Sequence, residues 1–516
     1  KFYESGITPE VTLSESTTIC ASNFRSPVFR HAGSTVMTFD EDNDGDKEVL
    51  LGDVSFSNLV KLTNGGDANL AFITGQDASF PSNDVAAEIN IFPAGYYLDV
   101  NNDGQSDLIA APNSKNGENY EVAWWYENVS ATAVPDFEFQ QRDFLVEEMI
   151  DLGSAAHPVF VDYNADGLQD MVVGSGGFFL PGGQRDARLF LYENTGSATA
   201  PAFTLVDDNY LNFKQFSDLF NTFAPCFGDL DNDNDMDLLV GEFNGSLFFA
   251  ENTAGPGEPF SFGSIQANYM NIDVGQASKP QIMDMNKDGL ADLVIGERNG
   301  NVNYLQNIGS TGNPMFNPIL TDSPNKDLFG GIDERGGNIV TGFSSPQLIA
   351  TEDDFLLVLG TEDNGLSIYS DIAGNLDGTF VKEETDWGNV RVGERIHPAL
   401  ADLTGNGRFE LLLGNNRGGL NGFRTNLSTD GTVPVRNAEP QASIKVFPNP
   451  ATDQVFVQSD RRIREVQLFD ITGKLLQRLS PNSTQTELRV SNLQQGVYVV
   501  MVDSAEGRSV QRIVVQ

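Results

Sequence analysis

One phrase recurs along this chain and constrains its fold more than any other feature. It reads Asp-x-Asp/Asn-x-Asp-Gly-x-x-Asp, followed by three or four apolar residues that usually end in Gly. Because self-similarity at a fixed period is the signature of repeat architectures, the phrase predicts an array of similar structural units. Five near-complete copies and one weaker, final copy begin at Asp40, Asp99, Asp162, Asp229, Asp284 and Asp402.

The spacing of these copies indicates a further unit that has lost part of the phrase. Neighbouring copies begin 55 to 67 residues apart, except for a gap of 118 residues between Asp284 and Asp402. In four units a proline lies four residues ahead of the first Asp, and Pro346 predicts by the same offset a degenerate loop at Ala350. The stretch there, ATEDDFLLVLG, lacks the first Asp and is two residues short. We therefore expect seven units, the sixth without an ion site.

Each unit has the pattern of a small antiparallel sheet. A short apolar run precedes the acidic loop, a second follows it, and two more come after Asn-Gly or Gly/Pro-rich turns. Four strands in about 60 residues are typical of a propeller blade, so the sequence predicts an all-β, seven-bladed β-propeller over residues 1–428. A right-handed β-helix is the structural alternative, but its repeats are much shorter. The seventh unit ends near Ser428 after three strands, so a segment within residues 8–30 could supply the fourth and close the ring.

The loops have the chemistry of a calcium site. Side chains at positions 1, 3 and 5 converge where the chain curls, Gly at position 6 permits the curl, and a carbonyl at position 7 and an acid at position 9 complete an oxygen shell. Such hard ligands favour Ca²⁺ over transition metals. An EF-hand is excluded because position 12 is apolar in all six loops. The candidate ligands are Asp40, Asp42, Asp44, Asp46, Glu48, Asp99, Asn101, Asp103, Gln105, Asp107, Asp162, Asn164, Asp166, Leu168, Asp170, Asp229, Asp231, Asp233, Asp235, Asp237, Asp284, Asn286, Asp288, Leu290, Asp292, Asp402, Thr404, Asn406, Arg408 and Glu410.

The loops differ in charge, and so we expect them to differ in affinity. The first and fourth carry four ligand carboxylates each and should bind tightest. Thr404 and Asn406 stand in the last loop where acids are usual, which predicts weaker binding there. Five strong calcium sites and a sixth, weaker one are expected.

Charge limits the partners of this chain. With 73 acidic and 31 basic side chains its formal charge is −42, which argues against nucleic acid or an anionic membrane as a partner. The chain contains no stretch of 18 apolar residues, so the sequence predicts no transmembrane segment. Lys1 is not followed by a leader, so we expect an exported form to have lost its signal peptide ahead of this numbering. Cys20 and Cys226 form one disulfide or remain two buried thiols.

The last 75 residues differ in kind. A linker-like stretch over 429–441 precedes residues 442–516, where nine Lys and Arg face seven Asp and Glu, a net charge of +2. Short alternating strands there predict a small Ig-like β-sandwich.

These motifs resemble two known families. The acidic units, followed by Tyr-x-Glu-Asn-x-Gly and Pro-x-Phe, resemble FG-GAP/VCBS repeats over roughly residues 30–430, which implies an integrin-α-like seven-bladed propeller with Ca²⁺ on its hairpin loops. Phe447-Pro448-Asn449-Pro450, Asp470-x-x-Gly473-Lys474, Gly496-Val497-Tyr498 and Arg512-Ile513-Val514-Val515 resemble the type A C-terminal sorting domain of the type IX secretion system. This resemblance implies secretion machinery as a partner of residues 442–516 and a secreted or outer-membrane-surface location in a Bacteroidota bacterium.

Three functions remain open on the sequence alone. A binding or adhesion module for glycans or proteins is expected first, because variable propeller loops carry recognition; Trp124, Trp125 and Trp387 are candidate contacts, although neighbours on a strand face opposite ways. A structural subunit of a larger surface assembly is the second hypothesis, and a polysaccharide-degrading enzyme the third. No catalytic motif stands out. His157 and His397 occupy equivalent positions in their units, which are typical of the start of a strand and not of a catalytic pair. We therefore expect no enzyme activity.

Overall fold

The computed structural model describes residues 2–4, 11–13, 33–67, 69–114, 117–180, 184–217, 222–335, 340–363, 365–429, 444–470, 474–504 and 507–516. The chain divides into two compact units, Lys1–Thr432 and Val433–Gln516. The predicted linker over 429–441 falls almost entirely outside the described residues.

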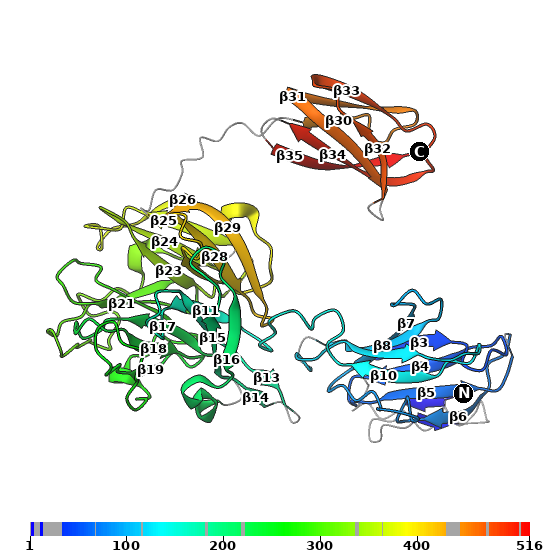
Figure 1. Ribbon diagram of the computed structural model, residues 1–516, viewed down its shortest axis with the longest axis horizontal. Helices are drawn as coiled ribbons and strands as arrows, with labels where there is room; N and C mark the ends of the chain where they lie inside the picture. Colours follow the sequence, from blue (N-terminus) through cyan, green and yellow to red (C-terminus); the bar gives the residue numbers. More distant parts are fainter. Residues whose placement is uncertain are drawn as a thin grey trace. The chain divides into compact units, whose positions relative to one another are not determined.

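Seven small antiparallel sheets, called blades 1 to 7, make up most of the first unit (Figure 1). Blades 1 and 2 contain β3 (Ser34–Phe39), β4 (Glu48–Asp53), β5 (Leu59–Asn64), β6 (Ile73–Asp77), β7 (Pro93–Leu98), β8 (Asp107–Pro112), β9 (Trp124–Asn128) and β10 (Phe137–Gln141). Blades 3 and 4 contain β11 (His157–Val161), β12 (Asp170–Gly174), β15 (Leu189–Asn194), β16 (Phe203–Asp207), β17 (Ala224–Gly228), β18 (Asp237–Gly241) and β19 (Leu247–Ala250). Blades 5 to 7 contain β20 (Lys279–Met283), β21 (Asp292–Gly296), β22 (Val302–Leu305), β23 (Ser345–Ala350), β24 (Phe355–Gly360), β25 (Leu366–Ser370), β26 (Val381–Glu384), β27 (His397–Ala401), β28 (Arg408–Gly414) and β29 (Leu420–Ser428).

Few other elements occur in this unit. Two short hairpins are formed by β1 (Phe2–Glu4) with β2 (Val11–Leu13) and by β13 (Phe178–Phe179) with β14 (Arg185–Asp186). Single 3₁₀ turns are η1 (Tyr210–Phe216), η2 (Tyr269–Asn271), η3 (Phe329–Gly331) and η4 (Trp387–Asn389). The prediction of an all-β, propeller-like fold built from seven repeats is confirmed.

Successive blades interlock through a glycine at the end of the second strand. A Cβ added there would lie 1.8 to 2.4 Å from a carbonyl oxygen of the neighbouring blade, closer than any side chain tolerates. The interlocking residues are Gly52, Gly174, Gly241, Gly296, Gly360 and Gly414. The equivalent residue of blade 2 is Ala111, whose Cβ excludes so close an approach of another backbone. The usual Gly of the repeat is therefore what allows two blades to touch.

The ring closes between blade 7 and blade 3. Gly414 faces the carbonyl of Ala156, and the N–H groups of Ala155 and Ala156 donate to the carbonyls of Asn416 and Asn415 at 3.2 and 3.0 Å. At the start of β11 and β27 the rings of His157 and His397 stack with centroids 3.6 Å apart. The inner strands β11, β17, β20, β23 and β27 thus contact one another in a closed cycle, while β3 contacts β7. The expectation of one seven-membered ring is corrected: five blades close the ring, and blades 1 and 2 form a pair.

The predicted fourth strand for blade 7 is not found among the described residues. Blade 7 has three strands, as expected from its end near Ser428. Most of residues 8–30 lie outside the described part of the chain, but β2 within that range pairs with β1 and contacts β6 of blade 1. The Val11 N–H donates to Gln76 Oε1 at 2.9 Å. The described N-terminal segment therefore lies against blade 1.

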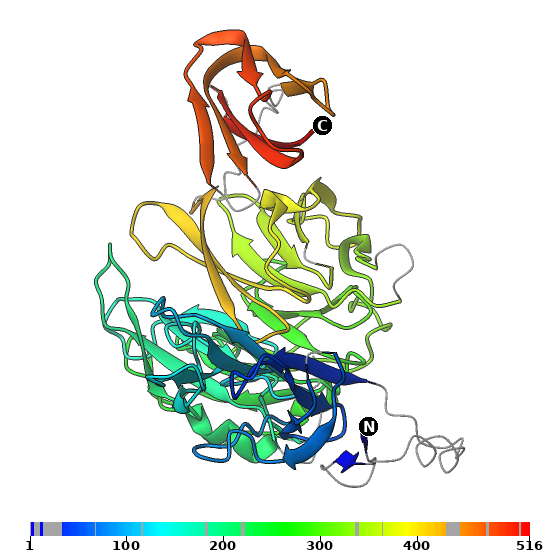
Figure 2. The ribbon, with the colours of Figure 1, turned by 90° about the vertical axis from the view of Figure 1, so that its right-hand side faces the viewer.

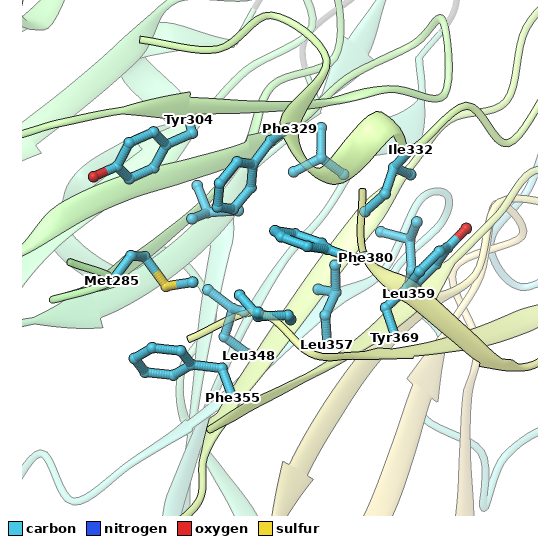
Figure 3. Packing of buried hydrophobic residues seen from close by; sticks show 13 residues of the cluster. Met285, Tyr304, Phe329, Ile332, Leu348, Phe355, Leu357, Leu359, Tyr369 and Phe380 are labelled. Carbon is cyan, nitrogen blue, oxygen red and sulfur yellow. The ribbon is translucent and has the colours of Figure 1, made fainter. Parts of the chain in front are cut away.

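The core lies between neighbouring sheets. Figure 3 shows one cluster, in which Met285 and Tyr304 from blade 5 pack with Leu357 and Phe380 from blade 6. Tyr304 also stacks on Phe329 of η3 with ring centroids 4.8 Å apart. Burial of such side chains stabilises a fold by about 1.5–3 kcal/mol each, so every blade depends on its neighbour for its apolar face. Cys226 is a free thiol in this core, and Cys20 lies outside the described residues.

The second unit is a small β-sandwich, drawn in orange to red in Figure 2. Its strands are β30 (Ile444–Phe447), β31 (Gln454–Asp470), β32 (Leu475–Leu479), β33 (Ser483–Arg489), β34 (Gly496–Ser504) and β35 (Gly507–Val515). The long β31 serves both layers: its first half pairs with β30 and β33, and its second half with β32 and β34. Buried Val and Leu side chains fill the space between.

Candidate metal centres

Six acidic loops join the first and second strands of their blades in a common register. The position 9 acid is the residue of the second strand that lies opposite the residue preceding the loop, as in the pairs Phe39–Glu48 and Val161–Asp170. The same pairing recurs in blades 2, 4, 5 and 7. Position 12 is a buried strand residue, as expected, so each loop ends in a β-strand and not in a helix.

Two left-handed residues curl each loop. Position 6 has φ between 71° and 94°, and it is Gly everywhere except for Asn234 in blade 4. Position 4 is also left-handed, with φ between 58° and 66°, which the sequence analysis did not foresee. Asn or Gly fills position 4 in four of the six loops and was the available signal, because both residues tolerate this conformation.

Backbone N–H groups hold the ligand side chains within the curl. In blade 3, Asp162 Oδ2 accepts from the Gly167 N–H at 2.9 Å, Asn164 Oδ1 from the Asp166 N–H at 3.0 Å, and Asp166 Oδ1 from the Leu168 N–H at 2.8 Å. The first and third of these bonds recur in the other five loops. In blades 3, 4, 5 and 7 the other oxygen at position 1 also accepts, from the N–H of position 5. Backbone donors therefore fix the side chains at positions 1 and 5.

The position 9 acid is a structural tie as well as a candidate ligand. Asp170 is fully buried; its Oδ1 accepts from the Asn194 N–H of the third strand at 2.7 Å and its Oδ2 from the Tyr163 N–H of the loop at 3.3 Å. Asp107, Asp237 and Glu48 make the same two bonds in their blades. The acid thus connects the loop to the sheet.

Burial makes these acids hard to ionise in the bare loops. Loss of solvation raises the pKa of Asp237 to about 7 and that of Asp170 and Asp292 to about 6, although backbone N–H donors act in the opposite direction. Carboxylates of the same loop add to the rise by repulsion. A cation at the centre of the loop would remove this repulsion, so the electrostatics favour occupancy by a positive ion.

Two loops bring three carboxylates together most closely. In the part of the chain that the structure describes, oxygens of Asp40, Asp42 and Glu48, and likewise of Asp229, Asp231 and Asp233, lie within 4.8 Å of one another. Oδ1 of Asp40 and Oδ1 of Asp231 are buried without a hydrogen-bond partner among the described residues. A buried acceptor without a partner costs about 1–3 kcal/mol, which a cation would offset. The donor set therefore fits a hard cation in these two loops, while the order of affinity among the six remains a prediction.

The sixth blade shows what the loop becomes without its ligands. Residues 350–355 link the pair Ile349–Leu356, whereas residues 162–169 link the equivalent pair in blade 3, so the loop is two residues shorter. Asp354 accepts from the N–H groups of Ile372 and Ala373, and these donors keep the pKa of its carboxyl below the usual range despite its partial burial. The Asp354 carboxylate therefore holds the turn that contains Ile372 and Ala373.

In blades 1 to 5 an asparagine at or just after the end of the third strand supports the tie, a role that was not predicted from the sequence. Asn194 Oδ1 accepts from the N–H groups of Gly196 and Ala202, and its Nδ2 donates to the Gln169 carbonyl of the loop at 3.3 Å. Asn307 repeats all three bonds. The recurring Glu-Asn pair was the signal for this contact, which couples the acidic loop to the following hairpin.

The three tryptophans that were candidate contacts differ in burial, because neighbours on a strand face opposite ways. Trp124 is buried in the blade core with its Nε1–H donating to the Glu121 carbonyl, so it is not a surface contact. Trp125 and Trp387 are partly exposed. His157 and His397 each begin an inner strand, as expected, but their mutual stacking was not foreseen because the sequence places their blades far apart.

In the second unit, Asn449 of the Phe-Pro-Asn-Pro motif fixes the last strand. Its Nδ2 donates to the Arg512 carbonyl and its Oδ1 accepts from the Val514 N–H, both at 2.8 Å. The basic-apolar end of the chain is thereby held against the turn after β30. No helix in the described part of the chain is long and apolar enough to cross a membrane.

Comparison with known proteins agrees with both units. Residues 99–173 and 162–240 match the FG-GAP-like repeat, and residues 445–516 match the secretion system C-terminal sorting domain. No curated protein matches the chain.

Solved structures similar to this chain are distant. An Agrocybe aegerita lectin described as recognising non-reducing terminal N-acetylglucosamine is 17% identical over 68% of this chain and 79% of its own, with a TM-score of 0.25. PorZ, a surface component of the type IX secretion system of Porphyromonas gingivalis, is 15% identical over 94% of this chain and 52% of its own, with a TM-score of 0.17. The extracellular domain of a hybrid two-component system from B. thetaiotaomicron is 11% identical over 94% of this chain and 57% of its own, with a TM-score of 0.23. Likenesses this low carry no argument about function.

The sorting domain places the protein outside the cell or on the surface of a Bacteroidota bacterium and implies engagement with the type IX secretion machinery. The chain is thus a secreted or cell-surface protein of the β-propeller type, which carries FG-GAP-like repeats ahead of a type IX C-terminal sorting domain.

Proposed function

We propose that this protein is a calcium-stabilised binding or adhesion module, exported by the type IX system. The observation that carries the proposal is the convergence of carboxylates in the loops of blades 1 and 4, with Oδ1 of Asp40 and of Asp231 left without a partner. In each of the six acidic loops the side chains at positions 1, 3 and 5, the carbonyl at position 7 and the acid at position 9 would hold the ion.

Calcium is favoured over other cations by the ligands themselves. All donors are carboxylate, amide, hydroxyl or carbonyl oxygens, and no His or Cys lies in any of the six loops. Ca²⁺ accepts six to eight such oxygens in an irregular shell, whereas Mg²⁺ demands a regular octahedron and keeps its water. When bound, the ion supplies charge neutralisation. It would tie the loop to the start of the second strand, next to the buried position 9 acid.

We further propose that the role of the ions is structural and that the propeller recognises its target without chemistry. The position 9 acids connect the loops to the sheets through two N–H groups each, so an ion there stiffens the blade. Weak extracellular sites have dissociation constants of about 10⁻⁴ to 10⁻³ M, a range that suits permanent occupancy outside the cell.

A glycan array tests the binding role. We expect the purified chain in calcium to retain at least one glycan class and to lose it after chelation, because the loops that display the surface are no longer fixed. Retention that survives full removal of calcium would show that recognition does not depend on the loops. Release of products from a bound glycan would instead support a polysaccharide-degrading enzyme, and an array without any signal would favour a structural subunit.

A further inference from the structure

A cavity of about 600 Å³ opens where the inner strands of the five-bladed ring begin. His157 of β11, Lys279 of β20 and His397 of β27 line it, together with residues from the connection between β8 and β9 of blade 2, such as Glu118 and Asn119. A volume of this size is typical of a small-ligand site. The cavity exists because blade 7 meets blade 3, which brings β11 and β27 together.

Cationic side chains gather in this cavity although the whole chain carries a formal charge of −42. Four of the lining residues are Arg185, Lys279, Arg395 and Arg417. Arg395 is paired with Glu362 outside the lining, with 3.2 Å between Nη2 and Oε1. The other three make no ion pair within 4.0 Å among the described residues, although the acids Glu118, Asp151 and Glu394 line the same cavity.

Lys279 is the buried cation among these four residues. It is 5% exposed, and its Nζ donates to the Phe343 carbonyl at 3.1 Å. Burial lowers its pKa to about 7 and repulsion from Arg395 adds to this effect, while attraction to Glu362 and Glu297 acts in the opposite direction. A buried ammonium with one neutral acceptor is costly unless a counter-charge approaches.

Arg185 presents a second cation to the same cavity. Its Nη1 donates to Ser154 Oγ at 2.8 Å, and burial lowers its pKa. A guanidinium offers parallel N–H donors that match a carboxylate in geometry.

The remaining walls are suited to a hydroxylated ligand. Glu118 and Asp151 accept from the backbone N–H groups of Asn90 and Gly153, which holds them in place. Burial lowers the pKa of both histidines, so they stay neutral beside the cations. The acids Glu118, Asp151 and Glu394 also line the cavity, so an anionic ligand meets repulsion from them as well as attraction to the cations.

We propose that this cavity binds a small monocarboxylate with several hydroxyl groups, of the uronic acid class, through Lys279 and Arg185. The inference rests on the binding role proposed above and names the chemistry of its ligand. The carboxylate pairs with Lys279 and Arg185, neither of which makes an ion pair among the described residues, and the neutral histidines offer donors and acceptors to hydroxyl groups.

Calorimetric titration of the full chain in calcium tests the proposal. The probes are galacturonate and glucuronate, with galactose and glucose as neutral controls and inorganic phosphate as the competing anion. We expect saturable binding of a uronate, about tenfold or more weaker in Lys279→Met and in Arg185→Gln, and no binding of the neutral sugars. Lys279→Met removes a buried charge and should therefore fold, which its melting temperature checks. Arg298→Gln is the matched control, because Arg298 bonds Gln276 and does not line the cavity.

Three results would overturn this proposal: no uronate binding, equal binding by the wild-type chain and both cavity variants, or tighter binding of phosphate. The glycan array separates these failures from failure of the binding role. A glycan retained equally by wild type and Lys279→Met would leave the binding module standing and move its site away from the cavity.

Discussion

Gly414→Ala is expected to lower the free energy of unfolding by about 3 kcal/mol, because it overpacks the contact that closes the ring. The new Cβ would lie 2.1 Å from the Ala156 carbonyl oxygen, which belongs to the backbone and cannot turn aside. Separation of the two blades would also break the bonds from Ala155 and Ala156 to blade 7. Urea unfolding of the full chain, followed by tryptophan fluorescence, measures the change.

Gly422→Ala is the matched control for this experiment. Gly422 lies in β29 of the same blade, and a Cβ there meets no atom within 4 Å. Its unfolding free energy should stay within about 0.5 kcal/mol of the wild type. Equal effects of the two substitutions would contradict the interlock.

A double-mutant cycle on His157 and His397 distinguishes a ring of five from a ring of seven. The two stacked rings, 3.6 Å apart, should couple by about 0.5–1.5 kcal/mol in a cycle of alanine variants. In a seven-membered ring blades 3 and 7 would be separated by other blades, and the two substitutions would be additive.

Removal of calcium is expected to have the largest effect of all. A ligand that binds only the folded state at a hundred times its dissociation constant contributes about 2.7 kcal/mol, and several loops would contribute together. Chelation should also leave the clustered carboxylates without a counter-ion. Burial and repulsion from other carboxylates of its loop already raise the pKa of Asp237 to about 7. Calorimetric melting in excess calcium and in excess chelator measures the difference.

The direction of the chelation result is decisive. We expect a lower melting temperature in chelator that returns when calcium is restored, and a smaller response to magnesium. An unchanged melt would mean that hydrogen bonds of the position 9 acids suffice to hold the loops.

The sequence predicted those features that depend on local patterns of residue types. Seven units, the shortened loop at Ala350 and the strand after each acidic phrase follow from local patterns, because period, turn chemistry and apolar alternation are local properties. The left-handed position 4 and the tie made by Asn194 were missed, since both depend on contacts made by the backbone.

Ring closure could not be read from the repeat count. Seven similar units suggest seven members, but the contact between blades depends on one small residue at the end of each second strand. Ala111 is the exception to the glycine rule, and it stands in blade 2, where the closed ring does not continue. The cavity with Lys279 and Arg185 depends on that closure, and so no local sequence pattern predicts it.

The most direct test of calcium-filled loops is the calcium content of the purified full chain, measured by mass spectrometry after dialysis against a calcium buffer. Five to six ions per chain are expected from the six loops, and Asp166→Ala should lower the number by one because Asp166 holds position 5 of the blade 3 loop. Asp353→Ala, in the shortened loop of blade 6, should leave it unchanged. A chain without calcium, or equal counts in the two variants, would contradict calcium binding at these loops.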